Sequence, residues 1–125
     1  MNVKYHYLIM SQKDMSQNQV LEEILRERTN YYFAKERLSD FWILPCPNFI
    51  KELNLDSSIK KTNFYLQKKD EINSSTQQNF YMSLVTLDKK FLNWIQLRLG
   101  YFENISQDII SKTKYKSDGV YGFFE

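Results

Sequence analysis

The 125-residue chain has little of several amino acids that common scaffolds and sites require: one cysteine, one histidine, two prolines and three glycines. A single cysteine cannot form an internal disulfide, so a disulfide-stapled scaffold is excluded and a reducing compartment is expected. One cysteine and one histidine are also too few for a zinc site. The glycines, at positions 100, 119 and 122, form neither a dinucleotide-binding fingerprint nor a phosphate-binding loop. The sequence therefore predicts no metal, no cofactor and no catalytic set.

Long apolar runs and charge of one sign are missing too. No apolar stretch approaches the roughly 20 residues that a membrane span needs. Residues 1–7 alternate in character instead of forming a signal-peptide core, and they lack the Arg- and Ser-rich pattern of a transit peptide. If the chain belongs to an organelle, we therefore expect it to be made there or to be already processed. The net charge of +2 is spread evenly along the chain, so charge alone indicates neither a nucleic-acid nor a membrane partner.

The residues that are abundant indicate a folded protein from an AT-rich genome. Hydrophobic residues make up 42% of the chain and aromatic residues 16%, which excludes a disordered or collagen-like sequence. Phe, Tyr, Met, Ile, Asn and Lys, whose codons are AT-rich, supply 55 residues, whereas Gly, Ala, Arg and Pro supply 10. This bias explains the many lysines and tyrosines without a nucleic-acid function. The length suits one domain.

Hydrophobic periodicity predicts strands and helices in turn along the chain. We expect strands at 3–10, 40–44, 63–67 and 80–87, with a loop or long hairpin connection at 68–79. A helix over 16–36 is predicted by a capping box of Ser16 and Gln19, and Pro47 is expected to begin a short helix that buries Phe49, Ile50 and Leu53.

The second strong helix is expected to follow Asp88, which has the character of an N-cap residue. Phe91, Ile95, Leu99 and Phe102 recur at helical spacing and predict its apolar face, with Gly100 weakening its last turn. This order of elements predicts an α+β fold: a mainly antiparallel sheet with helices packed on one face. We expect a single domain over residues 1–103, and residues 104–125 as a C-terminal tail or short extra strand.

Reactive groups give little support for catalysis. Cys46 and His6 could form a thiolate pair, but a cysteine between two prolines is more often a small buried apolar residue. His6 lies within a predicted strand, and no Glu-x-x-His pair is present, so the ligand set of a di-iron bundle cannot be built. These patterns predict a protein that is not an enzyme.

Two motifs combine aromatic and charged residues. In Asp40-Phe41-Trp42 the two aromatic side chains point to opposite faces of the predicted strand, so one must be covered by another element or another protein. In the helix, Trp94 and Arg98 are four residues apart and form an aromatic–guanidinium pair. Trp and Arg are enriched at interface hot spots, so the motifs predict a partner-binding surface. The alternative is an internal Asp40–Arg98 ion pair with both tryptophans in the core.

Lysines and aromatic residues also interleave near His6 and before Lys68, which a sheet that stacks single-stranded RNA bases would use. The chain has only four arginines and lacks the Gly-aromatic signature of RNA-binding sheets, which count against this function. A single-strand RNA-binding module of the plastid is therefore kept as the alternative interpretation. A small tetrapyrrole-binding protein, with His6 as the axial ligand, is a further alternative.

Four segments in register resemble one known family. They are the strand Lys4-Tyr5-His6-Tyr7-Leu8 with Ser11-Gln12-Lys13, the helix end Leu25-Arg26-Glu27-Arg28, the Asp40-Phe41-Trp42 run, and Val85-Thr86-Leu87-Asp88-Lys89 leading into the segment from Phe91 to Leu99. Over residues 4–102 they resemble the hypothetical chloroplast reading frame fifty-four family, also called the low-chlorophyll-accumulation family. This chain is longer than the family pattern around residues 61–79, and the tail after Glu103 shows no match.

The resemblance implies a non-catalytic accessory role in chlorophyll biosynthesis. Members of this family assist the aerobic magnesium-protoporphyrin IX monomethyl ester cyclase, whose larger di-iron subunit carries out the oxygen chemistry that gives protochlorophyllide. The resemblance places the docking patch at Asp40, Phe41 and Arg98; Trp42 and Trp94 are added on physical grounds alone. It also implies a plastid-encoded chloroplast protein, on the stromal side, that associates with the thylakoid membrane through its partner.

Overall fold

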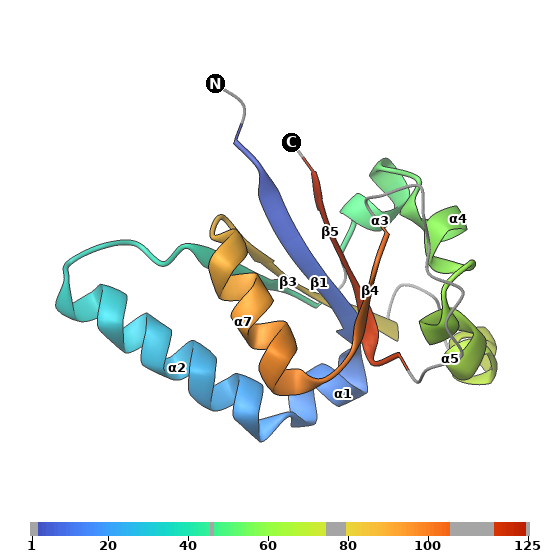
Figure 1. Cartoon of the computed structure of the whole chain (residues 1–125), viewed down its shortest axis with the longest axis horizontal. Helices are drawn as coiled ribbons and strands as arrows, with labels where there is room; N and C mark the ends of the chain where they lie inside the picture. The colour runs from blue at the N-terminus through green and yellow to red at the C-terminus, as the bar shows by residue number, and fades with distance from the viewer. Residues whose placement is uncertain (1–2, 46, 75–79, 106–116, 125) are drawn as a thin grey trace.

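The computed structural model describes residues 3–45, 47–74, 80–105 and 117–124. Over these residues five strands form one sheet, with helices packed against it (Figure 1). In chain order the elements are β1 (Tyr5–Ser11), α1 (Gln12–Gln17), α2 (Gln19–Ala34), β2 (Phe41–Leu44), α3 (Phe49–Glu52), α4 (Leu55–Ile59), α5 (Asn63–Ser74), β3 (Tyr81–Thr86), α7 (Lys89–Leu99), β4 (Phe102–Asn104) and β5 (Gly119–Phe124).

β1 is the central strand of the sheet, whose order is β2-β3-β1-β5-β4. It pairs antiparallel with β3, where His6 lies opposite Thr86, and antiparallel with β5, where His6 lies opposite Phe123. β2 pairs antiparallel with β3, and β4 pairs parallel with β5. The prediction of an α+β fold with a mainly antiparallel sheet is confirmed.

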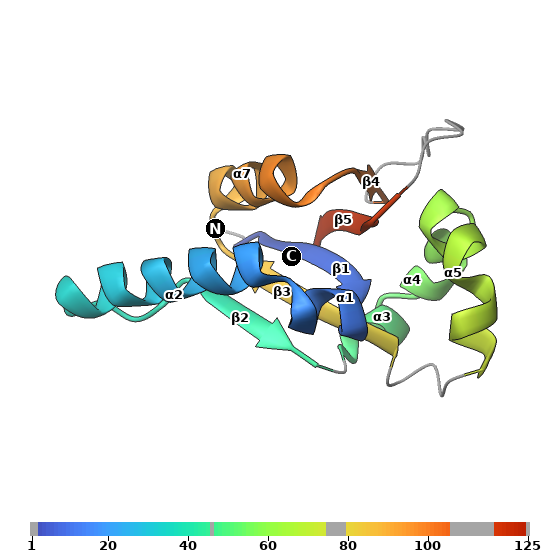
Figure 2. The ribbon, with the colours of Figure 1, turned by 90° about the horizontal axis from the view of Figure 1, so that it is seen from below.

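The two faces of β1 belong to two apolar clusters, because successive side chains of a strand point to opposite faces. Tyr7 and Ile9 pack with residues of α3, α4 and α5, whereas Leu8 and Met10 pack with residues of α1, α2 and α7. Figures 1 and 2 show α3, α4 and α5 gathered together, away from α2 and α7. The two strongly predicted helices, α2 and α7, thus share one face of the sheet, and the helices between β2 and β3 pack on the other. The prediction of helices on one face only is therefore wrong, because both faces of β1 are apolar and each is covered by helices.

The helix predicted at 16–36 is α2, which begins later, at Gln19, and a separate helix, α1, precedes it. Ser11 caps α1 by accepting a hydrogen bond from the Asp14 amide at 3.1 Å, and Asn18 caps α2 by accepting one from the Leu21 amide at 3.0 Å. The capping box predicted at Ser16 is wrong, because the Ser16 hydroxyl donates to the Lys13 carbonyl instead. The extended backbone of Asn18 separates the two helices.

The strand predicted at 63–67 is also wrong, because this segment begins α5. Its first amides, those of Asn63 and Phe64, donate to the Glu103 carboxylate at 3.1 and 2.9 Å. That carboxylate comes from β4, so a residue distant in sequence fixes the start of the helix. Residues 68–74 of the expected loop continue α5, and residues 75–79 lie outside the described residues.

Of the remaining predictions, three strands and one helix cap are confirmed, and the positions of Phe102 and Leu53 are wrong. The strands predicted at 3–10, 40–44 and 80–87 are confirmed as β1, β2 and β3, and the Asp88 carboxylate caps α7 by accepting from the amides of Lys90 and Phe91. α7 ends at Leu99, and Gly100 follows it with a positive φ of 146°. Phe102, predicted on the helix face, therefore lies in β4 instead, and Leu53, predicted as buried, is exposed.

The C-terminal segment supplies an inner strand of the sheet. Of the two alternatives for 104–125, the residues from 119 to 124 form a strand, β5, between β1 and β4. Val120 is fully buried in the cluster that contains Tyr7 and Ile9. Gly119 is required there, because a Cβ atom at this position would collide with the Ile9 carbonyl oxygen.

Candidate functional site

Asp40, immediately before β2, lies against Arg28 of α2. The Arg28 Nε atom donates to Asp40 Oδ1 at 2.9 Å, and Nη2 donates to Oδ2 at 2.7 Å, which is a two-point contact. The Tyr32 hydroxyl donates to the same Oδ2 atom at 3.0 Å. Both carboxylate oxygens of Asp40 are therefore engaged by α2.

Arg28 also connects α2 to the start of α7. Its Nη2 atom donates to Asp88 Oδ2 at 3.2 Å, while Asp88 Oδ1 caps the helix through the Lys90 and Phe91 amides. The guanidinium carbon lies 3.7 Å from the centre of the Phe91 ring, a cation–π distance. One side chain thus holds α2, the start of β2 and the first turn of α7 together.

Hydrogen bonds of the backbone reinforce this junction. The Asp40 carbonyl accepts from the Thr86 hydroxyl at 3.0 Å and from the Leu87 amide at 3.1 Å. The Thr86 hydroxyl accepts in turn from the Asp88 amide at 3.2 Å. The end of β3 is therefore fixed to the residue that pairs with Arg28.

The charges at this junction shift each other's proton affinities. Burial alone would raise the pKa of Asp40, but the hydrogen bonds from Arg28 and Tyr32 outweigh it and lower that pKa. The hydrogen bond to Asp40 raises the pKa of Arg28, and burial together with the same carboxylate raises the pKa of Tyr32. These shifts favour an ionised Asp40 carboxylate held by a charged guanidinium and a neutral phenol at neutral pH.

An open groove of about 720 Å³ lies between α2 and α7 beside this network. Arg28, Tyr31, Phe91 and Trp94 are among the residues that line it. Phe41 is half-buried, packs in the cluster beneath α7, and has its ring centre 6.2 Å from that of Phe91. Asp40 and Phe41 do not line the groove themselves; they contact Arg28 and Phe91, which do.

The outer surface of α7 continues from this groove as a row of exposed side chains. Trp94 is 48% exposed and Leu97 86% exposed, and Arg98 is exposed beside them. Residues three and four positions apart share one helix face, so these three side chains form one surface. Arg98 forms no ion pair or hydrogen bond with the part of the chain that the structure describes.

Trp42 lies apart from the other predicted site residues. Its Cα partner on β3 is Val85, which belongs to the cluster on the opposite side of the sheet from Phe41. Trp42 is 44% exposed, and its ring centre lies 6.4 Å from that of Tyr5. The structure thus brings Asp40, Phe41 and Trp94 to one side of the molecule, with Arg98 further along α7, and leaves Trp42 on the other side.

The internal alternative, an Asp40–Arg98 ion pair with both tryptophans in the core, is wrong. The partner of Asp40 is Arg28, and both tryptophans are nearly half exposed. The expected Trp94–Arg98 pair is also not observed; among the described residues, the guanidinium that lies over aromatic rings is that of Arg28. Arg28 is a site residue that the sequence reasoning missed, although a charge four positions after Ile24 on an apolar helical stripe is a signal that could have identified it.

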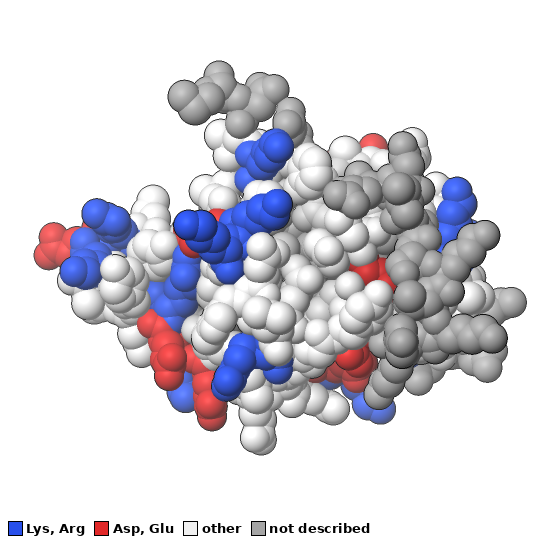
Figure 3. Space-filling model, viewed as in Figure 1, with Lys and Arg blue, Asp and Glu red and all other residues white. Residues whose placement is uncertain are grey.

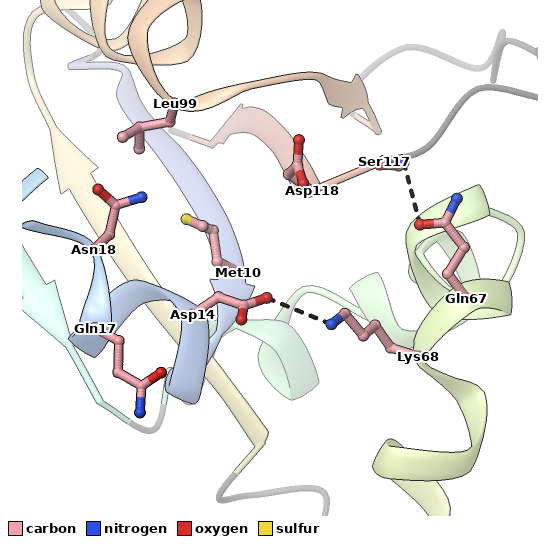
Figure 4. Close-up of a pocket in the computed structure, with 9 residues that line it drawn as sticks. All are labelled: Met10, Asp14, Gln17, Asn18, Gln67, Lys68, Leu99, Ser117 and Asp118. Carbon is pink, nitrogen blue, oxygen red and sulfur yellow. Dashed lines mark hydrogen bonds and ion pairs between the residues drawn. The ribbon is translucent and has the colours of Figure 1, made fainter. Parts of the chain in front are cut away.

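A second pocket, of about 370 Å³, lies where α1, α5 and the start of β5 meet (Figure 4). Lys68 pairs with Asp14 at 3.5 Å, and the Ser117 amide donates to Gln67 Oε1 at 3.3 Å. The Asp118 carboxylate accepts from the Tyr101 amide at 3.1 Å. These polar groups bind one another across the pocket, so they connect three elements of the fold.

The other reactive residues form no site in the described part of the chain. Within it, no three His, Cys, Asp or Glu side chains are grouped to hold a metal ion, and no helix has the length and apolar character to cross a membrane. Burial, followed by the nearby charges of Lys89 and Lys4, lowers the pKa of His6. Cys46 lies outside the described residues, so the Cys46–His6 pair is not described.

Charge on the molecular surface is mixed. Figure 3 shows basic and acidic side chains interspersed over α2 on this face, with uncharged surface around them, whereas the charged residues of α7 itself, Lys89, Lys90 and Arg98, are all basic. A single-stranded RNA tract would instead be followed by a continuous basic groove. The geometry of this face therefore gives the RNA-binding alternative no specific support.

Comparison with known proteins identifies the family. The Ycf54 protein family matches residues 3–108 of the chain. A Ycf54 protein of Porphyra purpurea is 32% identical over 97 residues, which cover 78% of this chain and 76% of the relative. A Ycf54-like protein of Synechocystis is 29% identical over 97 residues, which cover 78% of this chain and 62% of the relative.

Solved structures show the same fold. The Ycf54 protein from Synechocystis has a TM-score of 0.61 and 23% identity, with 99% of this chain and 87% of that one covered. The Ycf54 protein from Thermosynechococcus elongatus has a TM-score of 0.56 and 24% identity, with 98% and 84% covered. These likenesses show the fold, and the match over residues 3–108 shows the family: the chain belongs to the Ycf54 family.

Proposed function

We propose that this chain is a non-catalytic accessory subunit of the aerobic magnesium-protoporphyrin IX monomethyl ester cyclase and that it binds the di-iron catalytic subunit. The sequence resemblance implies this role, and membership of the Ycf54 family supports it. Relatives from red algae and cyanobacteria fit a plastid protein. We further propose that it works on the stromal side of the thylakoid membrane, which it reaches through its partner.

The observation that carries the proposal is the exposed row on α7. Trp94 and Leu97 present a large apolar area to water next to Arg98, a cation without a partner in the described part of the chain. Aromatic residues and arginine are the types that dominate binding energy at protein interfaces. In the complex, Trp94 and Leu97 lose contact with water, and Arg98 pairs with a partner carboxylate.

The experiment is capture of the purified di-iron subunit by folded variants of this chain. Leu97→Ala and Arg98→Ala should each weaken binding by about 2 kcal/mol or more, which is roughly 30-fold in affinity. Leu66→Ala on α5 is the matched control for Leu97→Ala, because Leu66 is 62% exposed on a different helix. Lys51→Ala on α3 is the control for the loss of an exposed cation.

The outcomes separate the function from the surface. If the unmodified chain does not capture the subunit, the accessory role is wrong. If it does, and both α7 variants capture as well as their controls, the surface is wrong. Trp42→Ala tests the predicted residue that lies on the other side of the sheet: a loss of affinity requires the partner to pass around the β2 edge.

A further inference from the structure

We infer that Arg28 is a positioning residue of the docking surface and that Asp40 serves that surface through Arg28, without touching the partner. This inference rests on the proposed function, because the partner is the same di-iron subunit. It separates the two charges predicted at the patch into different roles: Arg98 contacts the partner, and Asp40 holds Arg28.

The first reason is that Asp40 has little capacity left for a partner. Its two oxygens accept three hydrogen bonds within the chain, two from Arg28 and one from Tyr32. The Asp40 side chain is only 18% exposed. A partner cation would have to displace a two-point guanidinium contact to reach it, whereas the exposed Arg98 is available without any rearrangement.

The second reason is what Arg28 holds in place. Its guanidinium lies on the Phe91 ring and bonds the residue that caps α7, so it sets where the first turn of α7 lies relative to β2. Trp94 follows Phe91 by three residues, which places it one turn further along the same helix. A shift at Arg28 is therefore transmitted through the helix to Trp94, Leu97 and Arg98.

The third reason is that lysine cannot replace arginine here. The contact uses two parallel donors on one carboxylate and a flat cation stacked on a ring, and an ammonium group supplies neither. In a chain with 13 lysines and four arginines, an arginine at this position is the less expected residue. Arg28→Lys keeps the charge and removes the fork, so it tests geometry and not charge.

The test is a double-mutant cycle measured as the dissociation constant for the di-iron subunit. Asp40→Asn and Arg28→Met should each weaken binding about tenfold, and the double variant should bind no more weakly than Arg28→Met, because both changes remove one linkage. If Asp40→Asn weakens binding by the same factor with and without Arg28, Asp40 contacts the partner and the inference is overturned. Arg28→Lys replaces Arg28→Met in the cycle if the latter does not fold.

Two controls remove simple loss of stability as the explanation. Ile59→Val lowers stability in the cluster on the other side of the sheet, and it should leave the affinity unchanged. Arg26→Lys changes an exposed arginine on α2, whose ion pair with Glu22 spans 3.7 Å, and should also leave it unchanged. If Ile59→Val weakens binding as much as Arg28→Lys, Arg28 is merely structural.

A readout without the partner distinguishes failure of the inference from failure of the proposed function. In a Trp42→Phe background, Trp94 is the remaining tryptophan, and its fluorescence reports the environment of α7. Arg28→Lys should shift this emission and Arg26→Lys should not. An unchanged spectrum overturns the positioning role even if the di-iron subunit binds, and a shifted spectrum supports it even if the subunit does not.

Discussion

At the scale of single residues, one guanidinium between two carboxylates organises the candidate site. The sequence indicates that Asp40 is important, but it offers Arg98 as the candidate internal partner. Arg28 and Arg98 both follow helical patterns, and only the packing of α2 against α7 decides which of them pairs with Asp40. Arg28 stands among apolar neighbours on its helix, and that position predicts burial without predicting the ion pair. The composition leaves four candidate arginines, and the geometry selects one.

The lowered pKa of Asp40 predicts how stability changes with acid. A carboxyl whose pKa is lower in the folded protein stabilises it above the ordinary carboxyl pKa, and the contribution disappears as the pH falls through the lowered value. We expect the free energy of unfolding in urea to contain a part that is constant near neutral pH and declines below about pH 4. The measurement is a series of urea titrations from neutral pH downwards.

Asp40→Asn is the control for this prediction. The variant should be less stable than the unmodified chain at neutral pH, and the difference should shrink as both are acidified, because protonated Asp40 no longer pairs with Arg28 as an ion. A difference that stays constant from neutral pH to about pH 3 would show that the charge of Asp40 does not stabilise the fold.

At the scale of elements, the sequence predicts the segments whose end signals are local. α7 is predicted because Asp88 caps it from the adjacent position, and β1 because its own residues are strand-forming. α5 is mistaken for a strand although Thr62 caps it locally by accepting from the Tyr65 amide at 3.2 Å, because its first two amides bond to Glu103, about 40 residues later in the chain. No pattern within residues 63–67 contains that information.

Glu103 therefore provides a test of how α5 is held. It is buried, and its carboxylate accepts the two first amides of α5. We expect Glu103→Ala to lower the free energy of unfolding by about 2–3 kcal/mol, because it removes the acceptor of the buried Phe64 amide. Glu103→Gln keeps one acceptor oxygen and should cost less; urea unfolding followed by circular dichroism measures both. Equal stability of Glu103→Ala and the unmodified chain would contradict this role of the carboxylate.

At the scale of the whole molecule, β1 joins two apolar clusters into one structure. Its side chains alternate between the cluster of α3, α4 and α5 and the cluster of α1, α2 and α7, and β5 pairs with it from the C-terminal end of the chain. The sequence predicts one sheet and one domain over residues 1–103. It cannot decide between a tail and a strand for the C-terminal segment, because β5 is defined by its pairing with β1 and β4.

The two tryptophans allow the unity of this structure to be measured, because each reports a different side of the sheet. Trp42 is on the side of Val85 and Tyr5, and Trp94 is on α7 on the other side. Since Tyr7, Leu8, Ile9 and Met10 of β1 serve the two clusters in alternation, neither cluster can lose its strand without exposing its counterpart. The single-tryptophan variants Trp42→Phe and Trp94→Phe should therefore give one shared transition, after correction for any change in stability seen by circular dichroism. If the Trp42 signal changes at a urea concentration where the Trp94 signal and the ellipticity are still native, the two sides unfold separately, and the molecule comprises two cooperative units that share a strand.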